Sequence, residues 1–190
     1  FAGLLLPMFA YMIKNKQPLN KLVRLSFTLI FIPSVVLAIV CFTSSKEIIE
    51  ILYNDGEEAV RVLPILMFCF LAIASTYIFG TLLTANNNLK QLNILAISGL
   101  ALNVILNLIL IPIYQAYGSA VASLITQLAV VLIQVVLVKR YFKFPYNWKF
   151  LITLILIVSV LFIVNINLNF DVVYRFIVIG LLGLLLSFTF

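Results

Sequence analysis

Histidine is absent from this sequence, and only 9% of its 190 residues are charged. The six acidic residues lie within residues 47–58 and at Asp171, outside the long apolar runs. The two cysteines, Cys41 and Cys69, fall inside such runs, where a structural disulfide is not expected. Hydrolases and transferases usually gather acids, bases, metal ligands or an activated nucleophile at one place. The sequence shows no catalytic, metal-binding or cofactor-binding constellation, and it predicts a protein that is not an enzyme.

Six apolar runs, at residues 25–43, 64–84, 92–113, 118–138, 150–164 and 176–190, contain no Lys, Arg, Asp, Glu or His. A helix rises about 1.5 Å per residue, so a hydrocarbon core of about 30 Å takes roughly 20 residues to cross. The first four runs are long enough outright, and the last two reach this length with their flanks. With 65% hydrophobic residues and a mean hydropathy of +1.25, the sequence predicts an all-α, polytopic transmembrane helix bundle. The predicted spans are residues 25–43, 64–84, 92–113, 118–138, 149–165 and 174–190, preceded by a partial helix at 1–13.

The basic residues are distributed unequally between the segments that join these runs. If consecutive runs cross the membrane, segments 14–24, 85–91 and 139–149 share one side; they hold nine of the twelve basic residues and no acid. The opposite side then holds all six acids. Basic loops stay in the cytoplasm, so these three segments are predicted to be cytoplasmic. The net charge of +6 is thereby attributed to topology, and nucleic acid is not an expected partner.

Uncharged polar residues follow one face of the third and fourth runs. Small or amide residues recur there every four positions, at residues 99–107 and again at 119–127. An amide in lipid must find a partner or water, so these faces should meet protein or a wet cavity. Two interpretations stay open, a hydrophilic path for a polar substrate and helix packing through small and amide residues. The substrate-path candidates are Asn103, Asn107, Ser123, Gln127 and Gln134.

Prolines and one charged segment refine the expected helix boundaries. Pro33 lies in the middle of the first run, where it removes a backbone hydrogen bond and predicts a kink. Pro64 and Pro112 are interpreted as helix-end residues. In residues 46–53, four aliphatic side chains are set against three charged ones, which predicts a short amphipathic helix at the membrane interface.

Basic residues near the cytoplasmic mouth are candidates for holding a phosphate. They are Lys21 and Arg24 before the first run and Lys90 before the third. The alternative is that they only set the topology, since such residues are common at the cytoplasmic ends of spans.

Two consecutive motifs resemble bacterial polysaccharide export proteins. In residues 103–114, NVILNLILIPIY, an Asn-rich helix ends in Ile-Pro, and in residues 117–123, YGSAVAS, a Tyr-Gly turn opens a small-residue helix. Upstream, three further segments are also similar to this family: EIIEILY at residues 47–53, LPIL at 63–66 and TLLTA at 81–85. The order and spacing of these motifs carry the resemblance.

The resemblance is to the multidrug, oligosaccharidyl-lipid and polysaccharide exporter superfamily, and within it to the O-antigen type flippases of lipid-linked oligosaccharides. It implies the carboxyl-terminal transmembrane lobe of a two-lobed exporter in the bacterial cytoplasmic (inner) membrane. The implied activity is translocation of undecaprenyl-diphosphate-linked oligosaccharide for surface polysaccharide synthesis. The implied partners are that lipid-linked oligosaccharide, membrane lipids, a missing amino-terminal lobe of the same chain and other polysaccharide assembly proteins, and no cofactor is implied.

One property departs from the pattern that the resemblance implies. Cationic side chains usually meet the diphosphate in the central cavity of these flippases, whereas no Lys or Arg lies within an apolar run here. Alternatives therefore stay open: a multidrug antiporter or a peptidoglycan-precursor flippase of the same fold, a non-transporting scaffold of a polysaccharide assembly complex, and a membrane-embedded glycan transferase.

Overall fold

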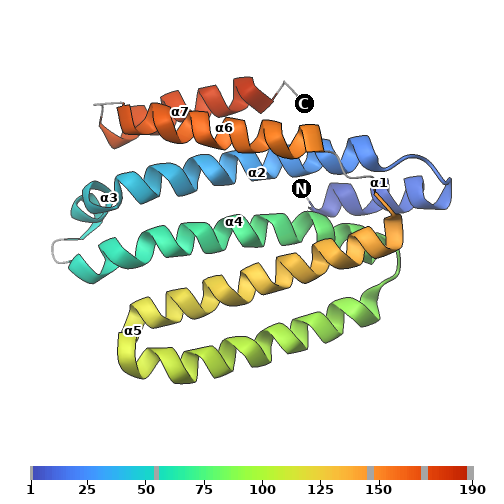
Figure 1. Ribbon diagram of the computed structural model, residues 1–190, viewed down its shortest axis with the longest axis horizontal. Helices are drawn as coiled ribbons and strands as arrows, with labels where there is room; N and C mark the ends of the chain where they lie inside the picture. Colours follow the sequence, from blue (N-terminus) through green and yellow to red (C-terminus); the bar gives the residue numbers. More distant parts are fainter. Residues whose placement is uncertain (1, 54–55, 145–147, 168–170, 188–190) are drawn as a thin grey trace.

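A computed structural model of the chain describes residues 2–53, 56–144, 148–167 and 171–187 (Figure 1). Within these ranges the regular secondary structure is entirely helical, which confirms the all-α prediction. The helices are α1 (Ala2–Lys14), α2 (Asn20–Thr43), α3 (Ser45–Leu52), α4 (Glu57–Ala85), α5 (Leu89–Phe142), α6 (Trp148–Asn167) and α7 (Val172–Ser187).

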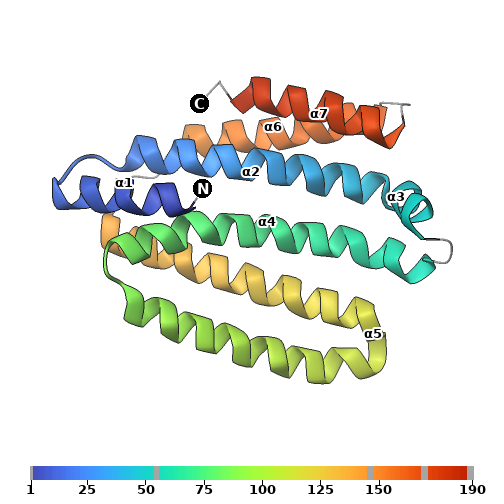
Figure 2. The same ribbon diagram turned by 180° about the vertical axis from the view of Figure 1, so that it is seen from behind.

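Four of these helices, α2, α4, α5 and α6, are long and apolar enough to cross a membrane. The long segments run side by side and alternate in direction along the chain, so that the molecule is a bundle (Figures 1 and 2). The shorter helix α7 covers most of the predicted sixth span, of which residues 188–190 lie outside the described residues. The amphipathic segment predicted at residues 46–53 is present as α3, with Ile49 buried.

Helix α5 is a hairpin made of the third and fourth predicted spans. The backbone leaves the helical conformation at Gln115, with φ 49° and ψ −127°, and separates a first arm (89–114) from a second arm (116–142). Pro112 lies just before this bend, as expected for a helix end. Gly118 lies just after it and is buried; a Cβ there would overlap the backbone carbonyl of Leu110. The close approach of the two arms therefore requires glycine at this position.

The interpretation of Pro64 as a helix-end residue is wrong, because α4 begins at Glu57 and contains Pro64. Glu57 and Glu58 occupy the first turn, where carboxylates complement the positive end of the helix dipole. These charged turns extend the helix beyond its apolar part. Pro33 lies inside α2, where Ser34 Oγ donates to the Ile30 carbonyl oxygen at 2.8 Å. The helix continues through Pro33, and the kink stays a prediction.

The helices are stacked in the order α6 with α7, then α2, then α4, then the α5 hairpin (Figure 1). Aliphatic side chains join α2 to α6 and α7 in one buried cluster that includes Ile39, Leu161 and Ile179. Gly183 of α7 permits this approach, since a Cβ there would lie 3.0 Å from Val36 Cγ2. In a membrane, such side chains stabilise the contact between helices through close van der Waals packing more than through the exclusion of water.

Helix α1 lies beside α4 at the end of the bundle where the three basic segments meet (Figures 1 and 2). Its buried side chains Leu5 and Phe9 belong to the same cluster as Ile78 and Leu82 of α4. The starts of α2, α5 and α6 all lie at this end, whereas α3 and the α5 bend lie at the other (Figure 1). We call these the basic end and the outer end of the bundle.

Candidate functional site

The five candidates for a polar path all lie on α5. Asn103 and Asn107 are on the first arm, and Ser123, Gln127 and Gln134 are on the second. Gln134 is buried, and the other four are half-buried. Asn103 and Asn107 contact different surroundings from those of Gln134.

Asn103 joins the two arms of the hairpin. Its Nδ2 donates to Thr126 Oγ1 at 3.4 Å, and Thr126 Oγ1 donates to the Ala122 carbonyl oxygen at 2.8 Å. Asn107 Nδ2 donates to Asn103 Oδ1 at 2.8 Å and to the Asn103 carbonyl oxygen at 2.9 Å. These bonds satisfy most of the polar groups within the hairpin itself. The amide oxygen of Asn107 is buried, however, and has no hydrogen-bond partner among the described residues.

Gly99 extends this contact toward the basic end. A Cβ at Gly99 would lie 3.0 Å from Val130 Cγ2 and 3.9 Å from Thr126 Cγ2, so the arms approach closely through a small residue. Thr126 was not among the candidates, although its position three residues after Ser123 places it on a neighbouring helix face. We call Gly99, Asn103, Asn107 and Thr126 the hairpin seam.

Gln134 contacts a different helix. A Cβ built at Gly80 of α4 would lie 3.6 Å from Gln134 Nε2 and 3.9 Å from its Oε1, so the amide faces Gly80. The Gln134 residue is 7% exposed, and its Oε1 has no hydrogen-bond partner within the part of the chain that the structure describes. A buried amide oxygen without a partner costs free energy, about 1–3 kcal/mol in proteins. Asn107 Oδ1, Thr28 Oγ1 and Asn165 Oδ1 are unpartnered in the same way among the described residues, and of these four only Asn107 and Gln134 were path candidates.

An open depression of about 400 Å³ lies between α1 and the half of α4 nearest the basic end. Gly3 and Leu6 line it from α1. Sequence reasoning missed it, although hydroxyl residues recur at three- and four-residue spacing along α4 and mark a polar face. We call it the hydroxyl depression; its lining on α4 is Thr76, Tyr77, Gly80, Thr81 and Thr84.

Each threonine hydroxyl of this depression donates its proton within α4. Thr76 Oγ1 donates to the Ile73 carbonyl oxygen at 2.7 Å, and Thr84 Oγ1 to that of Gly80 at 2.8 Å. Thr81 Oγ1 likewise donates to the Tyr77 carbonyl oxygen. A hydroxyl has one proton and two lone pairs, so these three groups remain hydrogen-bond acceptors.

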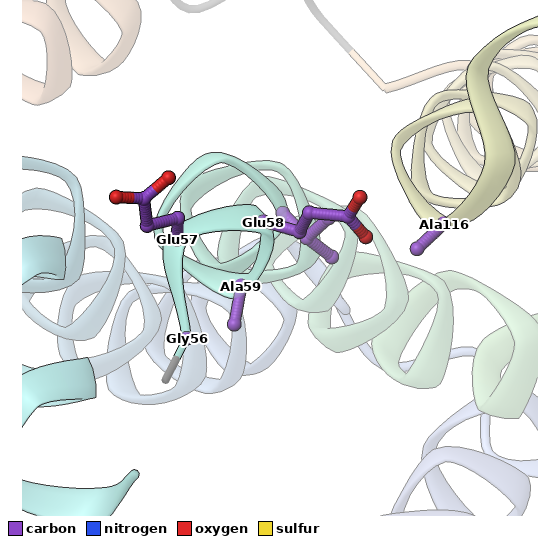
Figure 3. Close-up of a pocket in the computed structure, with 6 residues that line it drawn as sticks. Gly56, Glu57, Glu58, Ala59 and Ala116 are labelled. Atoms are coloured by element: carbon purple, nitrogen blue, oxygen red, sulfur yellow. The ribbon is translucent and has the colours of Figure 1, made fainter. Parts of the chain in front are cut away.

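A second open depression, of about 680 Å³, lies at the outer end between the start of α4 and the α5 bend. Figure 3 shows Glu57 and Glu58 pointing in different directions from α4, with Glu58 directed toward Ala116. Both glutamates are exposed, and the remaining lining side chains are small or aliphatic. We interpret this surface as the solvent-exposed first turn of α4 and not as a binding site.

The three phosphate candidates are not gathered into one cluster. Lys21 and Lys90 are exposed, and the start of α5 lies on the opposite side of α4 from α2 and α6 (Figure 1). The Arg24 guanidinium carbon lies 4.8 Å from the centroid of the Phe150 ring, a cation–π contact between α2 and α6. The phosphate role of these residues stays a prediction.

Polar side chains also join α6 and α7 to the end of α2. Arg175 Nη1 donates to Ser44 Oγ at 2.9 Å, and Asn165 Nδ2 donates to Thr43 Oγ1 at 2.7 Å. A cation at the carboxyl end of a helix is favoured by the helix dipole. We call Thr43, Ser44, Asn165 and Arg175 the outer clasp. Sequence reasoning assigned Arg175 no contact, since the residue that it bonds lies 131 positions away.

No known protein family, curated protein sequence or solved structure matches this chain. What the protein does is therefore inferred from its own helices, polar groups and charges.

Proposed function

We propose that this protein is a lobe of a membrane exporter that translocates undecaprenyl-diphosphate-linked oligosaccharide across the bacterial cytoplasmic membrane. One observation carries the proposal. Two of the five path candidates, Asn107 and Gln134, keep a buried amide oxygen that lacks a partner among the residues described. They stand at two levels of α5, one toward the outer end and one toward the basic end. Unmatched acceptors inside a bundle with membrane-length helices suit a cargo that brings hydrogen-bond donors.

The chemistry of an oligosaccharide fits such a route. Sugar headgroups carry many hydroxyl donors, and losing water from them must be offset by hydrogen bonds along the way. Uncharged acceptors bind more weakly than charged ones, and a transport route needs binding that also permits release. The six apolar runs contain no charged residue, so the described part of this route suits the sugar of the cargo and offers no cation to its diphosphate.

The helix order and the charge distribution give further support. The motifs at residues 103–114 and 117–123, which resemble the polysaccharide exporters, flank the bend at Gln115. Segments 14–24, 85–91 and 139–149 meet at one end of the bundle as far as they are described (Figure 1). The positive-inside rule then places the basic end in the cytoplasm.

A non-transporting scaffold is the second candidate, and the hairpin seam favours it. Asn103 and Thr126 bond each other across the two arms, as expected for polar residues that hold helices together. The scaffold proposal requires the same packing role for Asn107 and Gln134. A multidrug antiporter has less support, since ion coupling commonly uses intramembrane acids and the apolar runs contain none.

Depletion of the full-length protein from bacterial cells tests the proposal. Undecaprenyl-linked oligosaccharide on the cytoplasmic leaflet and surface polysaccharide are both quantified. We expect the lipid-linked pool to rise, and the intact gene to restore it. A double variant with Asn107→Leu and Gln134→Leu that still inserts should fail to restore the normal pool. The control Asn93→Leu, which changes an exposed amide on the first arm of α5, should restore it. Unchanged lipid-linked pools with altered drug sensitivity would instead identify an antiporter.

A further inference from the structure

We infer that the hydroxyl depression is a binding site for a neutral, hydroxyl-rich headgroup, namely the sugar of an amphipathic glycolipid. This inference rests on the proposed function and deepens it by naming a site and the chemistry that the site recognises. Its lining residues come from α1 and α4, and none of them was a path candidate; Gln134 of α5, which was one, lies next to Gly80.

The first argument is the buried amide behind the depression. Gly80 lines the depression, and the Gln134 amide lies next to the position that a Gly80 side chain would occupy. The amide is nine-tenths buried, and its oxygen lacks a partner among the described residues. Because position 80 has no side chain, none stands between the α4 backbone and the Gln134 amide.

The second argument is the hydrogen-bonding character of the lining. The hydroxyl protons of Thr76, Thr81 and Thr84 are used within α4, so these groups offer lone pairs only. Together with the Gln134 oxygen they form a set of acceptors. Tyr77, which is 58% exposed, adds a hydroxyl that can donate or accept. A ligand that fits this set must supply several donors.

The third argument is charge. The lining residues that the structure describes include no Lys, Arg, Asp or Glu. An anionic headgroup would need donors or cations, and a cationic ligand would be favoured by a carboxylate. A neutral polyol supplies donors without requiring either. Exposed apolar groups at the rim, Leu6 and the Tyr77 ring, suit contact with the lipid part of the same ligand.

Protection of an introduced thiol tests this site in the full-length protein. Thr81→Cys is placed in a variant whose buried native cysteines are replaced by alanine (Cys41→Ala and Cys69→Ala), and the protein is embedded in lipid nanodiscs. The rate of maleimide labelling is measured with three probes that share one alkyl chain, all below their micelle concentrations. The probes are octyl glucoside, octyltrimethylammonium and octyl phosphate.

We expect octyl glucoside alone to slow the labelling of the T81C thiol, saturably and at least about threefold. Tyr77→Phe and Thr84→Val should each weaken the protection roughly two- to tenfold, the effect of one lost hydrogen bond. Thr153 near the basic end of α6 provides matched controls, because its hydroxyl also donates within its own helix. T153C labelling should not respond to the glucoside, and T153V should leave the protection unchanged.

Three results would overturn the inference. Equal protection by all three probes would identify a general apolar surface, and protection by the ammonium probe alone would identify a cation site. A T81C thiol that does not react while T153C reacts would show that protein covers the depression. These failures differ from failure of the proposed function: if depletion still raises the lipid-linked pool, the flippase proposal stands and only the site is wrong.

Discussion

The hairpin seam and the hydroxyl depression are built from the same kinds of residue and have opposite surroundings. Both place small and polar side chains at three- and four-residue spacing on membrane-length helices. In the seam, Asn103 and Thr126 face each other and bond. In the depression, the threonine hydroxyls bond their own helix, and the threonines line open volume. A polar stripe in a membrane helix is therefore a packing device or a site depending on what lies opposite it.

The largest effect on stability is expected at the bend that closes the seam. Gly118→Ala would place a methyl group against the Leu110 carbonyl, a backbone atom that cannot move without opening the hairpin. We expect a loss of about 3 kcal/mol in the free energy of unfolding, at the upper end for an overpacked position. Denaturant titration in mixed micelles measures it. Gly180→Ala is the control, since a Cβ there meets nothing within 4 Å among the described residues. Equal stability of the two variants would show that the arms are not closely packed at the bend.

The outer clasp is a second closed polar contact, and its loss should cost less. Arg175→Met removes the donor to Ser44 Oγ, and a hydrogen bond to a charged group contributes about 2 kcal/mol. Faster amide hydrogen exchange in α7 would report the separation of α7 from the end of α2. Arg61→Met, an exposed arginine on α4 near the same end, should change nothing. If R175M and R61M exchange alike, the clasp does not hold α7.

The seam itself should show a coupling of about 1 kcal/mol between Asn103 and Thr126. A double-mutant cycle with Asn103→Leu and Thr126→Val measures it from the unfolding free energies of the four proteins. Because this pair is satisfied within the hairpin, T126V should also leave the lipid-linked pool of complemented cells at its normal level. If the two substitutions change the unfolding free energy additively, the hydrogen bond between Asn103 and Thr126 does not hold the arms together. If T126V raises the lipid-linked pool, Thr126 belongs to the transport route.

The sequence predicts this fold well where the bilayer alone determines the length and the helical conformation of a segment. Charge-free runs near 20 residues had to become helices, and Pro112 with Gly118 marked the bend between the arms of α5. The start of α4 was missed, because residues 57–63 lie before the apolar run that defined the expected helix. A membrane does not limit how far a helix extends into water.

The contacts that define the two regions lay beyond sequence reasoning for a different reason. Gln134 and Gly80 are on separate helices, and so are Arg175 and Ser44, so each pairing depends on how the helices pack. The four-residue spacing of Asn103 and Asn107 identified a polar face but not its neighbour. Hydroxyls were overlooked because threonine can bond its own helix and thus needs no partner to be tolerated in an apolar run.

The smallest expected change in stability is a gain, from Gly80→Ala in α4. This variant also distinguishes the hydroxyl depression from the hairpin seam most clearly. Gly80→Ala fits, since its Cβ would make ordinary contacts of 3.6 and 3.9 Å with the Gln134 amide. Replacing glycine inside a helix should stabilise α4 by about 0.5–1 kcal/mol. The same methyl group would lie against the Gln134 amide at a residue that lines the depression, so protection of the T81C thiol by octyl glucoside should weaken. Gly180→Ala should share the gain in stability and leave the protection intact. A G80A protein that loses stability, or that binds the glucoside as before, would show that Gly80 is a packing residue like those of the seam.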